Sequence, residues 1–203
     1  MNQIRIRATF DFIDPGSYLV HELLGRWVAD DDRTLSASFH PLELRAPSSP
    51  PLDPGIPQWR TLTDAMAALA EREGIPFDPP DFVPWTRKAH ELTFHAGEKG
   101  QSEASRDALF RAYFVDGLDI GRVDVLVELA EALELEASET RTVLGVDRFL
   151  PHVEEARREA RSRGIRGVPT LEIGGRRLEG LRTIEEFRTF VYVEDDDMPA
   201  EDH

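Results

Sequence analysis

Residues 164–180 limit the fold of this chain more than any other part of its sequence. A long polar helical pattern ends at the glycine that opens the segment, since glycine is the usual left-handed residue at a helix end. Residues 168–173 are short, apolar and β-prone, residues 174–175 are a Gly-Gly hairpin signal, and residues 176–179 form the returning strand. Pro169 cannot donate to a sheet ladder, so it fits only a strand start or an edge. We therefore predict a helix, then a β-hairpin that begins at a proline.

The Val168–Pro169 peptide has two possible geometries. An X-Pro bond costs only about 0.5–1 kcal/mol to hold in cis. A cis bond here would turn the backbone of Val168 outward and leave its N–H and C=O free to hold an extended ligand. The alternative is a plain hairpin with a trans proline, and this segment alone does not decide between the two.

Composition excludes several classes of partner. The chain has 203 residues, which suits one domain or one domain with a large insertion. A net charge of −15 argues against nucleic acid and against anionic membranes. The sequence has no long apolar run, and its N-terminus enters a strand pattern without the apolar core of a signal peptide. We expect a cytoplasmic protein with no nucleic-acid or membrane partner.

The sequence contains no cysteine. This removes disulfides, thiolate nucleophiles and thiolate metal ligands together. His90 and His95 are five residues apart, which is not the i,i+4 spacing of a helical metal pair. The acidic run at residues 194–202 lacks the glycine and the spacing of a calcium loop. We expect no metal and no resident cofactor.

The N-terminal third has the pattern of a βαβ unit. Residues 4–12 alternate between apolar and polar side chains, as a half-buried strand does. Asp14 is a predicted N-cap, and Pro15 suits the first turn of the helix that follows. Residues 35–39 then predict a second strand, parallel to the first.

The middle of the chain is predicted to be helical. Its helical patterns cover residues 59–74, 85–97, 104–113, 123–133 and 138–144. We interpret their large aromatic side chains as core, namely Trp59, Trp85, Phe110 and Phe114. A long polar helix at residues 147–163 follows, with Glu154/Arg158 and Glu159/Arg163 as i,i+4 pairs. A capping box at residues 183–186 opens the last helix.

Strand patterns at both ends of the chain flank this helical middle. The economical solution is one sheet assembled from both ends, with the helices folded over it. We therefore predict an α/β fold with residues 1–42 and 147–193 as one domain and residues 58–145 as a helical insertion. Residues 194–203 are predicted to be a disordered acidic tail.

Two motifs carry a family resemblance. A strand runs into Asp11-Phe12-Ile13-Asp14-Pro15-Gly16-Ser17-Tyr18 at a helix start, and Gly167-Val168-Pro169-Thr170 precedes the hairpin. This pair resembles the DsbA-like branch of the thioredoxin superfamily, in particular its cytoplasmic FrnE-like thiol–disulfide oxidoreductases. Segments 87–92 and 108–114 of the helical middle are similar to that subgroup as well. The resemblance implies a thioredoxin-like fold with a helical insertion, a cis Pro169, and a position for Pro169 beside Asp14–Ser17.

The chain departs from the family at the active-site motif. The family has Cys-Pro-x-Cys where this chain has Asp14-Pro15-Gly16-Ser17. A helix N-terminus carries roughly half a positive charge and stabilises a thiolate there. Here it faces a fixed carboxylate. A related branch, similar to kappa-class glutathione transferases and 2-hydroxychromene-2-carboxylate isomerases, has serine at the first position, where a neutral-pH Asp14 would repel the glutathione thiolate.

The resemblance makes Asp14 and Ser17 the candidate catalytic residues. Asp14 is either a helix cap, or a general base or acceptor for a ligand amine, and Ser17 is either a helix residue or a catalytic hydroxyl. The candidate ligand-binding residues are Pro15, Gly16, Val168 and Pro169. The arginines of residues 157–182 either hold an anion or form a solvated surface.

Three functions follow from these readings. The first is a redox-inactive DsbA-like protein that binds an extended peptide or small thiol ligand between Asp14–Ser17 and Val168–Pro169. The second is a glutathione-dependent isomerase or transferase, for which glutathione would be the cofactor. The third is a structural or dimerising module. Whether the chain is an enzyme stays open, as does a homodimer.

Overall fold

The central sheet combines strands from the two ends of the chain. The computed structural model describes residues 3–30, 35–50, 52–78 and 81–192. The strands are β1 (Ile4–Phe10), β2 (Leu35–Pro41), β3 (Thr170–Ile173) and β4 (Arg176–Glu179), in the order β2-β1-β3-β4. β2 is parallel to β1, whereas β3 pairs with β1 antiparallel through Arg7↔Glu172. The sheet assembled from both ends is therefore observed, as is the predicted β3–β4 hairpin.

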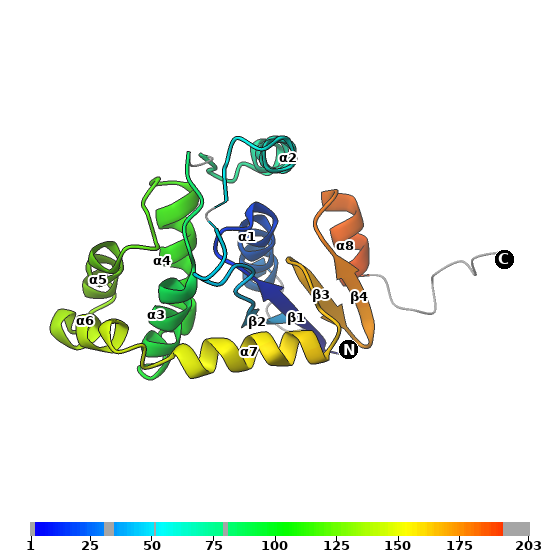
Figure 1. Cartoon of the computed structure of the whole chain (residues 1–203). Helices are drawn as coiled ribbons and strands as arrows, with labels where there is room; N and C mark the ends of the chain where they lie inside the picture. The colour runs from blue at the N-terminus through cyan, green and yellow to red at the C-terminus, as the bar shows by residue number, and fades with distance from the viewer. Residues whose placement is uncertain (1–2, 31–34, 51, 79–80, 193–203) are drawn as a thin grey trace, which may run out of the picture.

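Three helices cover the sheet. They are α1 (Pro15–Asp30), α7 (Leu150–Ser162) and α8 (Ile184–Tyr192). The rings of Trp27 on α1 and Phe187 on α8 lie 4.7 Å apart, so these two helices share one face. α7 crosses the opposite face (Figure 1). Side chains of β1 alternate between the two faces of the sheet. Ile6 and Ala8 are buried, and Arg7 between them contacts Glu159 of α7.

The helical middle lies at one end of the sheet (Figure 1). Its helices are α2 (Pro57–Glu73), α3 (Arg87–Gly97), α4 (Ser102–Phe114), α5 (Val123–Ala132) and α6 (Ala137–Gly145). One continuous hydrophobic core joins them to the sheet and to α1. The predicted sheet domain and helical insertion are separate in the sequence, but among the described residues they share this one core.

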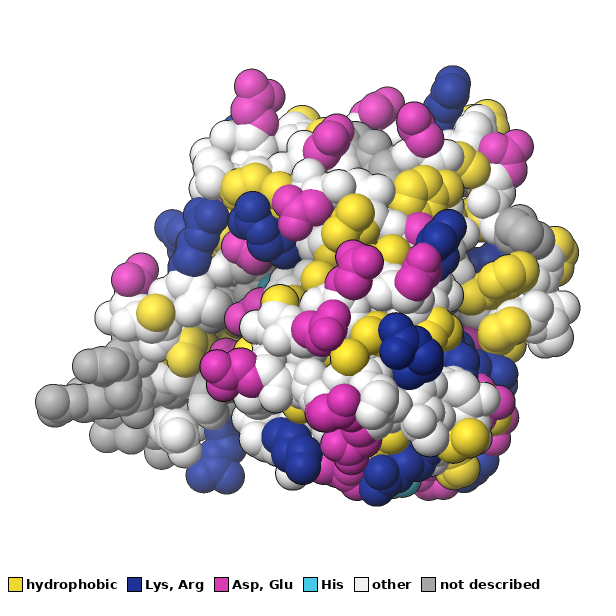
Figure 2. All heavy atoms as spheres, turned by 90° about the vertical axis from the view of Figure 1, so that its left-hand side faces the viewer, with side chains coloured by type: hydrophobic (Ala, Val, Ile, Leu, Met, Phe, Trp, Pro, Cys, Tyr) yellow, Lys and Arg dark blue, Asp and Glu magenta, His cyan; other side chains and the backbone are white. Residues whose placement is uncertain are grey.

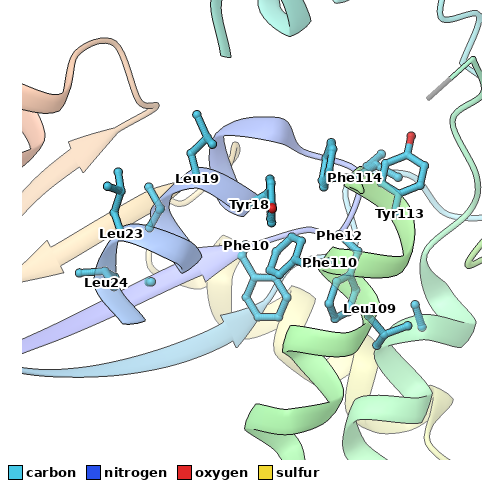
Figure 3. Packing of buried hydrophobic residues seen from close by; sticks show 14 of the residues in the cluster. Phe10, Phe12, Tyr18, Leu19, Leu23, Leu24, Leu109, Phe110, Tyr113 and Phe114 are labelled. Carbon is cyan, nitrogen blue, oxygen red and sulfur yellow. The ribbon is translucent and has the colours of Figure 1, made fainter. Parts of the chain in front are cut away.

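Aromatic side chains make the junction between sheet and insertion (Figure 3). The rings of Phe12 and Phe110 lie 5.0 Å apart, and those of Tyr18 and Phe114 are stacked at 5.0 Å. Such pairs stabilise a fold by about 0.5–1.5 kcal/mol each beyond the area they bury. The expected aromatic core is correct for Phe110 and Phe114, but Trp85 is 40% exposed. Trp85 lies before the start of α3 at Arg87.

Helix ends follow the local signals. Gly74 ends α2 in the left-handed region, at φ +61°. Gly174 and Gly175 turn the β3–β4 hairpin with φ values of +56° and +95°. The Oγ1 of Thr183 accepts from the N–H of Glu186 at 3.0 Å, as a capping box requires.

The predicted ion pairs of α7 are wrong. The helix begins at Leu150 rather than residue 147. Arg158 pairs with Glu155, whereas Glu159 reaches Arg7 and Arg163 reaches Glu172. Both of the latter pairs join α7 to the sheet, because the helix packs on it and long side chains find partners there.

The surface of the helical side mixes both signs of charge. Figure 2 shows acidic, basic and hydrophobic side chains interspersed over this face. Within the described parts of the chain, no helix is long and apolar enough to cross a bilayer. The predicted tail at residues 194–203 lies outside those parts.

Candidate functional site

The start of α1 and the start of the hairpin are in direct contact. A Cβ atom added to Gly16 would lie 3.0 Å from the Cδ of Pro169 and 3.4 Å from its Cγ. The Val168–Pro169 peptide bond is cis. Two segments about 150 residues apart in the sequence therefore meet, with Pro15, Gly16 and Pro169 all buried at the contact.

The backbone of Val168 is the unpaired part of this contact. Among the residues the structure describes, none hydrogen bonds to its N–H or its C=O. Its neighbours are held firmly, since the Pro169 carbonyl accepts from the Gly180 N–H at 2.8 Å and the Thr170 hydroxyl donates to the Gly167 carbonyl at 2.8 Å. Val168 itself is half-buried, so a donor and an acceptor stand at a fixed place.

Asp14 caps α1. Its Oδ2 accepts from the Ser17 N–H at 2.6 Å, and the carboxyl is 6% exposed. Burial, with a smaller contribution from the nearby Asp11, raises the pKa of Asp14 to about 7, and the hydrogen bonds from Ser17 oppose this change. Burial therefore works against the fixed carboxylate expected from the sequence, because it favours the protonated form of this group.

Ser17 places a hydroxyl in the same region. Its Oγ is buried and, within the described residues, has no hydrogen-bond partner. His21, one turn later, does not serve as its base, since the ring contacts Asp107 and Arg106 instead. The start of α1 thus holds a buried hydroxyl next to the carboxyl of Asp14.

A buried Asp11–His90 pair supports this region, and the sequence analysis missed it. Both side chains are fully buried, and the His90 Nε2 lies 3.0 Å from the Asp11 Oδ1. Asp11 also accepts from the N–H groups of Phe12 and Leu44, both at 2.8 Å. The one available signal was an aspartate between two buried phenylalanines, which indicates a satisfied polar group.

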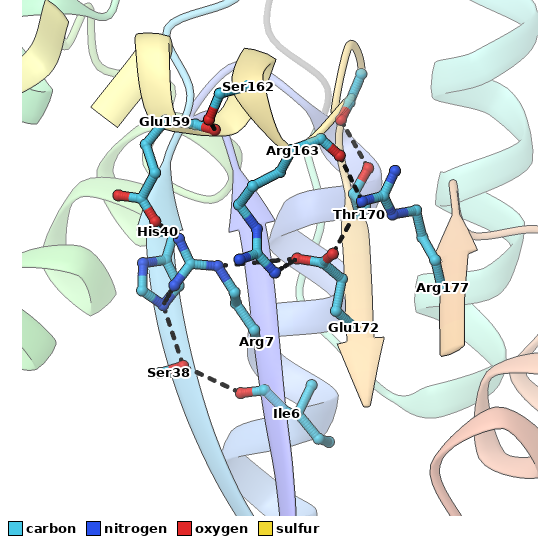
Figure 4. A network of polar contacts seen from close by, with 11 residues as sticks. Ile6, Arg7, Ser38, His40, Glu159, Ser162, Arg163, Thr170, Glu172 and Arg177 are labelled. Carbon is cyan, nitrogen blue, oxygen red and sulfur yellow. Dashed lines mark hydrogen bonds and ion pairs between the residues drawn. The ribbon is translucent and has the colours of Figure 1, made fainter. Parts of the chain in front are cut away.

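The arginine-rich segment forms a structural network on the α7 face of the sheet (Figure 4). Glu172 binds Arg163 and Arg177, each at 2.9 Å. Arg7 reaches Glu159 at 2.5 Å and contacts His40, and burial together with this Arg7 charge lowers the pKa of His40 to about 4. These guanidinium groups are engaged within the chain, so the network does not offer Arg163 or Arg177 to an anion.

The cavities found elsewhere on the molecule have other linings. One of about 230 Å³ lies between α1, β2 and α4, and another lies beside α2. Neither includes Asp14, Ser17, Val168 or Pro169.

Known proteins share the sequence pattern and the fold of this chain. Residues 5–191 match the family model of the DSBA-like thioredoxin domain. An uncharacterized Bacillus subtilis protein, YwbO, is 30% identical over 185 residues, which cover 84% of this chain and 87% of that protein.

Solved structures agree. A probable DsbA oxidoreductase from Streptomyces coelicolor has a TM-score of 0.78 and 26% identity, over 93% of this chain and 88% of the other. A 2-hydroxychromene-2-carboxylate isomerase has a TM-score of 0.73 and 21% identity, over 87% and 88%. The cytosolic disulfide reductase DsbM from Pseudomonas aeruginosa, solved with GSH, has a TM-score of 0.65 and 21% identity, over 95% and 94%. The two latter likenesses concern the fold alone.

Proposed function

The chain belongs to the DSBA-like thioredoxin domain family. We propose that it binds an extended peptide at Pro169, whether or not the peptide carries a thiol, and that it does not exchange disulfides. The chemistry of disulfide exchange needs an attacking thiolate on the protein. The chain has no cysteine. The sequence resemblance places Asp14 and Ser17 at the two cysteine positions of the family's motif.

The observation that carries the proposal is the backbone of Val168. Within the described residues its N–H and C=O have no partner, although the residues on either side are hydrogen bonded. An extended peptide can pair with such a donor and acceptor as an added strand does. Its side chains would lie over the start of α1, where Gly16 contributes no side chain of its own.

Asp14 suits a binding role. A carboxyl group with a pKa of about 7 exists at neutral pH in a donating and an accepting form. It can therefore hydrogen bond to a peptide carbonyl or to an amide. The same property favours the glutathione-dependent alternative, because a protonated Asp14 no longer repels a thiolate and the buried Ser17 hydroxyl is a donor beside it.

The test uses the S-carbamidomethylated B chain of insulin as a thiol-free extended probe. We expect saturable binding in fluorescence anisotropy, with shifts of the Gly16, Val168 and Thr170 amide signals in NMR spectra. Pro169→Ala should weaken binding at least tenfold, because the ring of Pro169 packs directly against Gly16 beside Val168. Pro151→Ala, at an exposed proline of α7, is the matched control.

Two results would contradict the proposal. One is equal binding by the two proline variants, and the other is a set of shifted amides that excludes Val168. Displacement of the probe by reduced glutathione would favour the small-thiol alternative over a peptide. Reduction of intact insulin above a protein-free control would overturn the redox-inactive assignment.

A further inference from the structure

A second candidate site lies at the β2 edge of the sheet, apart from Pro169. The cavity of about 230 Å³ there is lined by the apolar side chains of Leu24, Val28, Ala37 and Phe39, and by His21 and Ser36 of the same two elements, α1 and β2. Dividing by the roughly 30 Å³ that a water occupies in the liquid gives room for about eight waters. This is the size of a ligand with about eight to ten non-hydrogen atoms.

Arg106 of α4 supplies a buried cation to this cavity. Its side chain lines the cavity, and the residue is 8% exposed. The guanidinium carbon lies 4.0 Å from the centre of the Phe39 ring, which is a cation–π contact. Among the described residues Arg106 has no ion pair, and its one hydrogen bond uses Nε, 3.3 Å from the Nδ1 of His21. The two terminal nitrogens are therefore unused donors.

The neighbouring acids do not neutralise this guanidinium by contact. Because the His21 Nδ1 accepts from Arg106, the ring carries its proton on Nε2, which lies 2.8 Å from the Asp107 Oδ1. Asp107 thus partners His21 rather than Arg106. Glu103 also lines the cavity, but its side chain is exposed at the rim. Burial lowers the pKa of Arg106 while Asp107 and Glu103 oppose that change, and arginine stays charged in proteins.

Burying a charge without a paired counter-charge raises the free energy of the fold. An anion that paired with the Arg106 guanidinium would therefore be stabilised there. The planar fork of an arginine matches a carboxylate with two parallel hydrogen bonds. The apolar wall excludes a purely ionic ligand, and the Glu103 carboxylate at the rim disfavours anions with several charges. We propose that the cavity binds a small amphipathic monocarboxylate, with its carboxylate on the terminal nitrogens of Arg106 and its hydrocarbon part against Leu24, Val28 and Phe39.

This proposal does not rest on the peptide site. Its test titrates the full chain with hexanoate, acetate and hexan-1-ol, and follows binding by calorimetry and by the amide signals of residues 24–28 and 36–39. We expect hexanoate to bind at least tenfold more tightly than acetate, which lacks the tail, and than hexan-1-ol, which lacks the charge.

Variants identify the cation. Arg106→Gln should weaken hexanoate binding at least tenfold, whereas Arg111→Gln, on the same helix with a 67% exposed side chain, should leave it unchanged. Glu103→Gln should tighten binding about threefold or more, because it removes a like charge from the rim. That gain cannot arise from a folding defect, so it protects the test if Arg106→Gln is destabilised.

The proposal is overturned if the wild-type chain shows no saturable hexanoate binding, or if hexan-1-ol binds as well as hexanoate. Equal binding by the Arg106→Gln and Arg111→Gln chains would also overturn it, as would a Glu103→Gln chain that binds no more tightly than the wild type.

Discussion

At the scale of single residues, Asp14 stands out because its two roles conflict. As an N-cap it accepts from the Ser17 N–H, which favours the ionised form. Burial opposes ionisation more strongly and raises the pKa to about 7. The folded protein therefore holds this proton more tightly than the unfolded chain does, and stability from this group falls as pH rises from about 4 to about 7.

Asp14→Asn should reveal this conflict. Asparagine is an equally good N-cap and carries no charge. Above pH 7 the variant should be more stable than the wild type by more than about 1.4 kcal/mol, which corresponds to one pKa unit. Near pH 4 the two should converge, because Asp14 is then protonated in the fold. Urea unfolding at pH 4.5 and pH 8 measures the difference.

The exposed Asp64→Asn substitution on α2 is the control, with no change expected in either buffer. A constant difference between Asp14→Asn and wild type at both pH values would show that burial does not govern this carboxyl.

At the scale of elements, the polar face of the sheet explains how α7 is attached. The i,i+4 spacing predicted ion pairs within the helix. Instead, Glu159 pairs with Arg7 of β1 and Arg163 pairs with Glu172 of β3. Glu172, with a side chain that is 15% exposed, receives bonds from both Arg163 and Arg177. Burial would raise the pKa of Glu172, but these two guanidinium groups outweigh it and the pKa is lowered.

Glu172→Gln should loosen this attachment. Hydrogen bonds to charged groups contribute about 1.5–3 kcal/mol, so we expect a loss of about 1–3 kcal/mol in the free energy of unfolding at pH 7. Glu179→Gln is the matched control on the neighbouring strand, since its carboxylate is 67% exposed and 3.9 Å from Arg177. Chemical denaturation of both variants measures the free energy of unfolding. Equal losses in the two variants would show that Glu172 does not attach α7 to the sheet.

At the scale of the whole molecule, one buried pair joins the two parts of the chain. Asp11 lies just after β1 and His90 lies on α3, so their 3.0 Å contact connects sheet and insertion. The aromatic core continues across the same junction, with the Phe12 and His90 rings 4.8 Å apart. Sheet and insertion should therefore unfold together.

His90→Leu tests this coupling. Removing one partner of a buried pair leaves the Asp11 carboxyl with its two backbone donors alone and costs about 3–5 kcal/mol. We expect that loss in a single transition that coincides in circular dichroism and tryptophan fluorescence. The exposed His152→Leu on α7 should change little. Two separated transitions in the wild-type chain would contradict a shared core.

Local patterns allowed much of this structure to be predicted. The α/β fold is confirmed, because βαβ spacing, the Gly174-Gly175 turn and the Thr183 cap are set by neighbouring residues. The long-range pairs were not predictable, since Asp11–His90 and His21–Arg106 are 79 and 85 residues apart. The raised pKa of Asp14 was missed for a related reason, as its burial comes from segments that sequence spacing does not bring together. The roles of Asp14, Ser17 and Val168 stay predictions.

The strand order carries a consequence for synthesis. β1 has β2 on one side and β3 on the other, and the β3 partner of Arg7 is Glu172. While a ribosome is still translating the insertion, one flank of the first strand has no neighbour to pair with. A nascent chain must keep that flank from other polypeptides until the hairpin emerges, so this fold is completed late, by the segment that also brings Pro169 to Gly16.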